Sequence, residues 1–223
     1  MIRLSRVGQS LGERELFRDV DLELAPGSFH FLTGPSGAGK TTLLRLCYGE
    51  LQPTTGQVEL FGTGLDDLGR DGLSEARQRI GIIHQDCQFL DHLSLAENLA
   101  LPFVVTGRPV PEQDLRELLA WVGLQEHADA HPPTLSGGER QRAALARAVI
   151  LQPAILLADE PTGNVDWEMS MRLMSLLAEL NRIGTAMLIA THDLNLIRAT
   201  KSQVSARILR IAEGRVQVAG AGL

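Results

Sequence analysis

The stretch that decides the fold is Gly34-Pro35-Ser36-Gly37-Ala38-Gly39-Lys40-Thr41, which matches the phosphate-loop pattern G-x-x-x-x-G-K-[ST] at every fixed position. The β-formers at 28–33 predict a strand before it, and the apolar spacing after it predicts a helix. Loop glycines let backbone N–H groups surround an anion, and the helix N-terminus adds partial positive charge. Lys40 can then reach the β- and γ-phosphates, and Thr41 can bind Mg²⁺. The sequence therefore predicts a nucleotide site built from Gly34, Pro35, Ser36, Gly37, Ala38, Gly39, Lys40, Thr41 and Thr42.

The composition of the chain limits the classes of protein that could contain this loop. The 223 residues are 44% apolar and 22% charged, which is typical of one large globular domain or two modest lobes. A net charge of −6 without any Lys/Arg block gives no reason to expect a nucleic-acid partner. Cys47 and Cys87 show no disulfide or metal spacing, so we expect small apolar fillers in a reducing compartment. The sequence has no secretory signal and no window near 18 apolar residues, so action at a membrane would need a partner.

The order of strand signals predicts an α/β fold. Residues 2–8 and 20–24 alternate apolar and polar side chains, as strands of a half-exposed antiparallel sheet do. The uninterrupted apolar runs at 154–158 and 186–190 are typical of buried parallel strands. The other expectations are strands at 57–62 and 80–83, a loop over the Gly- and Asp-rich 63–76, a hairpin over 207–218 and a frayed tail at 219–223.

Strand signals vanish from about 88 to 150, and helical periodicity replaces them. Helices are predicted at 94–100, 111–122 and 138–151 in this part, and at 167–182 and 193–200 after it. The fold class expected is an α/β P-loop NTPase core with a mixed sheet, N-terminal antiparallel strands and an inserted helical subdomain. We expect one domain over 1–223, divided into a core lobe of 1–87 with 151–218 and a helical subdomain of 88–150.

Acidic and polar residues follow the predicted buried strands. Asp159 and Glu160 end the run at 154–158, and acids at the carboxyl end of a parallel strand face the ligand crevice of an α/β sheet. Asp159 is therefore expected to complete a Mg²⁺ shell with Thr41. Glu160 is expected to polarise an attacking water, and His192 lies after the next buried run. The alternatives are two surface acids that cap a strand and a histidine that serves only its loop.

A second motif makes the sequence similar to a known family. Residues 135–140 read Leu135-Ser136-Gly137-Gly138-Glu139-Arg140, the signature of ATP-binding cassette (ABC) ATPases. The sequence also contains the family's other motifs in the family's order, namely the phosphate loop, Gln85, the acids at 159–160, the loop at 163–166 and His192. The resemblance extends from the strand at 2–8 to the hairpin near 215. It implies a nucleotide-binding domain that binds ATP and Mg²⁺ and hydrolyses ATP.

The same resemblance implies a composite site. Two such domains associate head to tail, so the signature residues of one copy meet the ATP in the phosphate loop of the other. The residues implied to bind across this homodimer interface are Ser136, Gly137, Gly138 and Glu139. The resemblance also implies that Glu160 is the general base, that His192 and Lys40 stabilise the γ-phosphate, and that Gln85 contacts the metal and the phosphate.

Three positions depart from the family's usual residues. Leu11, or a neighbour of it, stands where an aromatic commonly stacks on adenine, so weaker packing of the base is expected. Phe17 is the nearest aromatic, but it occupies an expected core position. His84 replaces an aromatic before Gln85, and Val165 replaces a leucine.

Within the family, the words 31–40, 98–102 and 157–164 resemble the cell-division ATPases. That resemblance implies a permease-like integral membrane partner, other division proteins as further partners, and a place on the cytoplasmic face of the inner membrane. The partner is expected to dock near 86–101, where Phe89, Leu90 and Leu93 are either contacts or part of the helical lobe's own core.

Other functions remain open from the sequence. An ATPase for lipoprotein release or macrolide efflux shares the word at 157–164. A soluble DNA-repair or translation ABC protein would have coiled-coil insertions or two cassettes, and this sequence has neither. A non-hydrolysing, nucleotide-dependent scaffold is the alternative of another class. It predicts that Glu160→Gln leaves cellular function intact.

Overall fold

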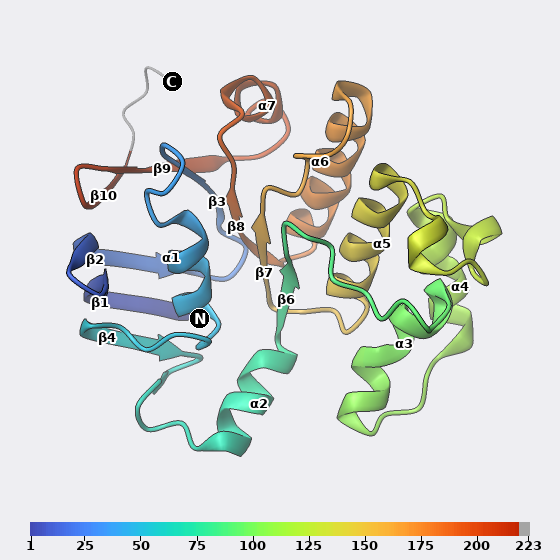
Figure 1. Cartoon of the computed structure of the whole chain (residues 1–223), viewed down its shortest axis with the longest axis horizontal. Coiled ribbons are helices and arrows are strands. Elements are labelled where there is room, and N and C mark those ends of the chain that lie inside the picture. Colours follow the sequence, from blue (N-terminus) through green and yellow to red (C-terminus); the bar gives the residue numbers. More distant parts are fainter. Residues whose placement is uncertain (219–223) are drawn as a thin grey trace.

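The computed structural model describes residues 1–218, and these residues form two sheets (Figure 1). The smaller sheet has four strands in the order β2-β1-β4-β5, and its neighbours pair antiparallel. Register shifts between Leu4 and Ser10 bend β1. The tail 219–223, expected to fray, lies outside the described residues. The bounds of these strands are β1 Ile2–Leu11, β2 Arg14–Leu24, β4 Thr55–Leu60 and β5 Thr63–Gly64.

The larger sheet has six strands in the order β10-β9-β3-β8-β7-β6. Five of them run parallel, from β9 to β6, and β10 adds an antiparallel edge to β9. Because β3, β7 and β8 run parallel side by side, their carboxyl ends meet at one edge of the sheet, where ligands bind in α/β folds. The bounds are β3 Phe29–Thr33, β6 Ile80–Ile83, β7 Ile155–Asp159, β8 Ala186–Ala190, β9 Ala206–Ala212 and β10 Arg215–Val218.

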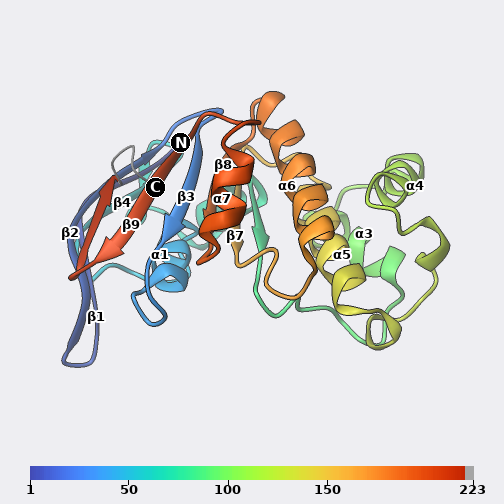
Figure 2. The same cartoon turned by 90° about the horizontal axis from the view of Figure 1, so that it is seen from above.

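Seven helices of the described chain surround these sheets. In both views α3 and α4 lie at the end of the molecule away from the small sheet, and α5 and α6 lie between them and the strands (Figures 1 and 2). No helix within residues 1–218 has the length and apolar character to cross a membrane. The bounds are α1 Lys40–Cys47, α2 Arg70–Gln78, α3 Leu95–Thr106, α4 Glu112–Trp121, α5 Gly137–Val149, α6 Trp167–Arg182 and α7 Leu194–Thr200.

The apolar runs of the large sheet face two separate cores. Leu32, Leu157 and Leu188 pack with α1 and the small sheet, whereas Phe31 and Leu156 pack with α5, α6 and α7. Successive side chains of a strand point to opposite faces, so a strand covered on both faces must be apolar throughout. Double coverage explains why 154–158 and 186–190 lack polar residues, and the predicted α/β layering of these segments is confirmed.

A third core holds the helical lobe together. It is formed by buried side chains of α3, α4 and α5 with the turns between them, among them Leu95, Leu99, Phe103 and Leu119. Helix α5 belongs to two cores, because Leu145 faces the sheet while its neighbour Ala146 faces the lobe. The division at 88 and 150 stays a prediction, and α5 ties the two parts together.

One predicted loop is wrong. The segment 63–76 contains the short strand β5 and most of α2. Gly69, Asp71 and Gly72 hid the helical signal because they are poor helix formers. Tertiary contacts hold α2 instead: Arg77 donates from Nε to the carbonyl of Tyr48 at 3.0 Å, and its Nη2 donates to that of Gly49 at 2.8 Å.

Candidate nucleotide site

The phosphate loop joins β3 to α1 in a conformation that requires glycine at two positions. Gly34 has φ +152°, and a Cβ there would lie 2.8 Å from the carbonyl oxygen of Ile211. Gly39 has φ +100°, and its Cβ would lie 3.1 Å from two ring carbons of Phe17. Side chains would therefore push the loop off the strands beneath it. The glycines of the motif serve close backbone packing as well as anion binding.

Lys40 lies folded back over its own loop. Its Nζ donates to the carbonyl of Gly34 at 2.9 Å and to that of Pro35 at 3.3 Å. Arg14, at the start of β2, donates from Nη2 to the carbonyl of Gly37 at 3.2 Å. Arg14 could not be predicted as a site residue, because this contact bridges 23 residues and belongs to no motif. Two cations therefore converge on a loop suited to an anion.

Thr41 and Asp159 meet as the sequence predicts. The Thr41 hydroxyl donates to Asp159 Oδ2 at 2.6 Å across 118 residues. Burial raises the pKa of Asp159 above its ordinary value, while the Thr41 hydroxyl and Lys40 act in the opposite direction. Thr41, Asp159 and Gln85 line a hollow of about 240 Å³. Hydroxyl, amide and carboxylate oxygens are the donors that Mg²⁺ prefers, so these residues fit that ion.

Glu160 and His192 come together at the ends of two neighbouring parallel strands. His192 Nδ1 lies 2.8 Å from Glu160 Oε1, and the Glu160 N–H donates to the carbonyl of Ala190 at 2.9 Å. Glu160 has φ +47°, which is uncommon for a residue with a side chain and concentrates at functional sites. Its side chain is 13% exposed, whereas that of His192 is 75% exposed. A shielded carboxylate beside an accessible imidazole is a suitable pair for proton transfer.

The signature residues start α5 with a complete capping box. Ser136 N donates to Glu139 Oε2 at 2.7 Å, and the Glu139 N–H donates to Ser136 Oγ at 3.3 Å. A Cβ at Gly137 would lie 3.4 Å from the carbonyl oxygen of Asn164, so the signature lies against the loop that follows β7. Figures 1 and 2 agree that α5 and α1 lie on opposite sides of β6 and β7. The signature therefore stays apart from the phosphate loop of its own chain.

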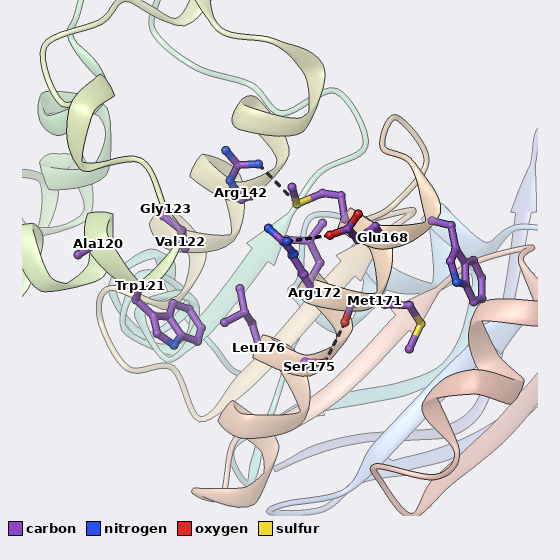
Figure 3. A pocket seen from close by; sticks show the side chains of 13 residues that line it. Ala120, Trp121, Val122, Gly123, Arg142, Glu168, Met171, Arg172, Ser175 and Leu176 are labelled. Atoms are coloured by element: carbon purple, nitrogen blue, oxygen red, sulfur yellow. Dashed lines mark hydrogen bonds and ion pairs between the residues drawn. The ribbon is translucent and has the colours of Figure 1, made fainter.

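A larger hollow elsewhere does not suit this chemistry. About 780 Å³ in volume, it lies between the end of α4 and α6 (Figure 3). Its acid, Glu168, is paired with Arg172 at 2.8 Å on the exposed face of α6. Arg142 points from α5 toward Met169, with Nη1 3.5 Å from Sδ. The wall carries no acid–histidine pair like that of Glu160 and His192.

The fold and this arrangement define a class of protein. The family model described as ABC transporter matches residues 17–163. The chain belongs to the ABC transporter family as an ATP-binding domain, and it is an ATP hydrolase. A phosphate loop, strand-end acids and a separate signature helix on one mixed α/β core are the features that this class combines.

Curated relatives are similar over almost their entire length. The cell division ATP-binding protein FtsE of Escherichia coli (strain K12) is 40% identical, with 97% of each chain covered. The lipoprotein-releasing system ATP-binding protein LolD of Bacteroides fragilis (strain YCH46) is 38% identical, covering 97% of this chain and 100% of that protein. These identities confirm the expected family, and they include two of the subgroups that the sequence left open, those for cell division and for lipoprotein release.

A solved structure supports the same fold. The ATP-binding cassette MJ0796, in a dimeric post-hydrolysis state bound to ADP and Pi, superposes with a TM-score of 0.86 at 32% identity, covering 97% of each chain. Another dimeric structure of that cassette gives 0.85. The two-sheet core and the helical lobe therefore have the arrangement of an ATP-hydrolysing cassette.

Proposed function

We propose that two copies of this chain enclose two ATP molecules head to tail, and that hydrolysis releases the pair. The observation that carries the proposal is the separation of the signature from the phosphate loop, by β6 and β7, within one chain. Helix N-terminal N–H groups at Gly137 and Gly138 suit a phosphate, and a second copy is the source of one. The dimeric MJ0796 structures support this arrangement.

Each copy contributes the groups that act on its own ATP. Lys40 exchanges its loop carbonyls for phosphate oxygens, and its charge stabilises the transferring group. Glu160 holds the attacking water and accepts its proton, while His192 orients that carboxylate and contacts the γ-phosphate. Thr41 and Asp159, with Gln85, would hold Mg²⁺, which neutralises phosphate charge when it is bound.

The sandwich is tested with Glu160→Gln, which removes the base but keeps the size of the side chain. With MgATP we expect this variant to sediment as a dimer and its turnover to fall by about 10²–10⁴-fold, the range for loss of a general base. Lys40→Ala in the same background is the control and is expected to stay monomeric. A monomer at saturating ATP in the Glu160→Gln variant would refute the sandwich.

We further propose that the dimer drives a permease-like membrane partner of the FtsX type during cell division and cell-wall remodelling, at the cytoplasmic face of the inner membrane. The similarity to FtsE along both chains supports this role. A groove of about 630 Å³ between α2, β6 and α3 offers a docking surface. Its wall carries Leu101, Pro102 and Val105, and Val105 is 82% exposed. Such a wall suits an amphipathic helix of the partner.

The groove proposed here as the docking surface is not lined by Phe89, Leu90 or Leu93, the residues suggested from the sequence. Phe89 packs into the cores, and the guanidinium of Arg147 lies 4.5 Å from its ring centroid. It therefore supports the lobe itself, which is the alternative that the sequence left open. Leu90 is 43% exposed, but neither Leu90 nor Leu93 lines the groove. The apolar contacts proposed here shift to the C-terminal half of α3.

Lipoprotein release is the second candidate, because LolD is nearly as similar; macrolide efflux of the MacB type remains a further alternative. Co-expression of the chain with an FtsX-type permease or a LolC–LolE-type pair, followed by purification from membranes, separates the first two. We expect the FtsX-type permease to co-purify, and Val105→Glu to abolish this. Ile183→Glu is the matched control, since Ile183 is 81% exposed and lies outside the groove. Retention of the LolC–LolE pair alone would overturn the cell-division role.

A further inference from the structure

The carboxylate that caps the signature helix has a contact that the chemistry above does not use. Glu139 Oε2 accepts hydrogen bonds from the backbone and the hydroxyl of Ser136, at 2.7 and 2.8 Å. Its other oxygen, Oε1, lies 3.2 Å from Nε2 of His127. His127 ends the short 3-10 helix η1 (Gln125–His127), which follows α4. The Glu139 side chain is 23% exposed, so solvent only partly screens this contact.

The Ser136 hydroxyl has one proton to donate, and Glu139 accepts it here. Hydrogen bonds from Ser136 hold the pKa of Glu139 below its ordinary value, so the carboxylate is anionic at neutral pH and a strong acceptor. A phosphate of the second copy competes with Glu139 for that proton. The balance between the two acceptors decides how readily the signature engages ATP.

His127 is placed to shift this balance. Its Nδ1 is buried and has no hydrogen-bond partner among residues 1–218, so the ring is held by its Nε2 side. Arg142, the nearby cation on α5, also lowers the pKa of Glu139, but its Nη1 points toward Met169 Sδ at 3.5 Å (Figure 3). A positive or donating group at Oε1 draws charge from the carboxylate and weakens its hold on the serine.

We propose that His127 is a positioning residue for the signature motif, which frees the Ser136 hydroxyl for the ATP of the second copy. The inference rests on the sandwich proposed above. His127 acts through Glu139 and touches no nucleotide in its own chain. Its removal is therefore expected to weaken association of two ATP-loaded copies without weakening ATP binding by one copy.

The experiment measures the dissociation constant of the dimer by sedimentation at saturating MgATP, in a Glu160→Gln background. His127→Ala is expected to raise this constant about fivefold, because each dimer loses two partly exposed contacts between an imidazole and a carboxylate. His127→Lys, which places a donating cation at this position, is expected to return the constant to within about twofold. His92→Ala is the matched control, since His92 is exposed in the same lobe and has no contact with Glu139.

A double-mutant cycle with Glu139 distinguishes a positioning role of His127 from a general structural effect. In a Glu139→Gln background, which keeps a capping-box residue, His127→Ala is expected to have no further effect. Equal dimer constants for His127→Ala and His92→Ala would overturn the inference, as would a rise that persists without Glu139 or a loss of ATP binding by the monomer. If the parent variant, with His127 intact, fails to dimerise, then the sandwich itself is wrong.

Discussion

Gly39 completes the phosphate loop in a conformation that a side chain would disturb in two ways. Its φ of +100° is unfavourable for an L residue, and a Cβ there lies 3.1 Å from two carbons of the Phe17 ring. Phe17 is fully buried, so its ring has little room to move. The backbone term costs about 1–2 kcal/mol and overpacking about 1–3 kcal/mol, so Gly39→Ala should lower the free energy of unfolding by about 2–5 kcal/mol.

Gly107 provides the control for the backbone term. It ends α3 with φ +66°, and a Cβ there meets nothing within 4 Å. Gly107→Ala is therefore expected to cost only about 1–2 kcal/mol. The difference between the two variants measures the contact with Phe17. Replacing the Phe17 ring with a smaller side chain should relieve this contact. Gly39→Ala combined with Phe17→Leu should therefore lower the free energy of unfolding by less than the sum of the two single changes.

Urea unfolding of the nucleotide-free chain, followed by circular dichroism, measures these losses. A fluorescent ATP analogue reports binding in parallel, and Gly39→Ala is expected to bind it more weakly than Gly107→Ala because the loop must shift. Equal unfolding losses for the two alanine variants, or strict additivity in the double variant, would refute the reasoning about the loop.

Three further predictions concern the site and the core. His192→Ala alone should lower kcat by about 10²-fold. In a Glu160→Gln background it should lower kcat little further, because the two side chains act as a unit. Losses that multiply in phosphate-release assays would contradict this. Asp159→Asn should lower kcat by about 10²–10³-fold yet raise the melting temperature of the nucleotide-free chain at pH 7.5. Burial raises the folded-state pKa of Asp159, so ionisation of this carboxyl destabilises the parent as the pH rises from 3.8 through the folded-state pKa. The difference in melting temperature between the variant and the parent should therefore shrink toward pH 4. A difference that grew toward pH 4 would contradict the reasoning. Burial raises the pKa of the Cys47 thiol to about 12, so a maleimide should label it at pH 8 only after unfolding in urea. Rapid labelling of the native chain would exclude that account.

Much of the site could be predicted because motif residues recur at strand ends. Thr41 and Asp159 are 118 residues apart, yet Thr41 lies in the first turn of α1 after β3 and Asp159 ends β7, and the carboxyl ends of such parallel strands converge. Fully apolar runs likewise marked the strands that are covered on both faces. Local sequence patterns were sufficient to predict a functional group wherever its position is set by a strand end, a loop or the start of a helix.

Contacts that a side chain makes with a different element could not be predicted from the sequence. Arg14 reaches Gly37 from a hairpin, and His127 reaches Glu139 from a turn, and neither pair has a spacing that recurs. The Phe17 ring beneath Gly39 was expected only to be a core residue. Helix α2 was missed because its stability comes from tertiary contacts of Arg77 and not from its own composition.

Helix α5 has a mechanical consequence. Its 13 residues span roughly 20 Å at 1.5 Å per residue, and its sides are embedded in both the sheet core and the lobe core. A tilt of roughly 10° about its sheet-bound end would swing Ser136 by roughly 3 Å, about one hydrogen-bond length. The helix is thus a lever whose fulcrum, near Val149, lies at the amino end of β7. A push on the helical lobe would therefore make or break contacts at the opposite end, at Ser136.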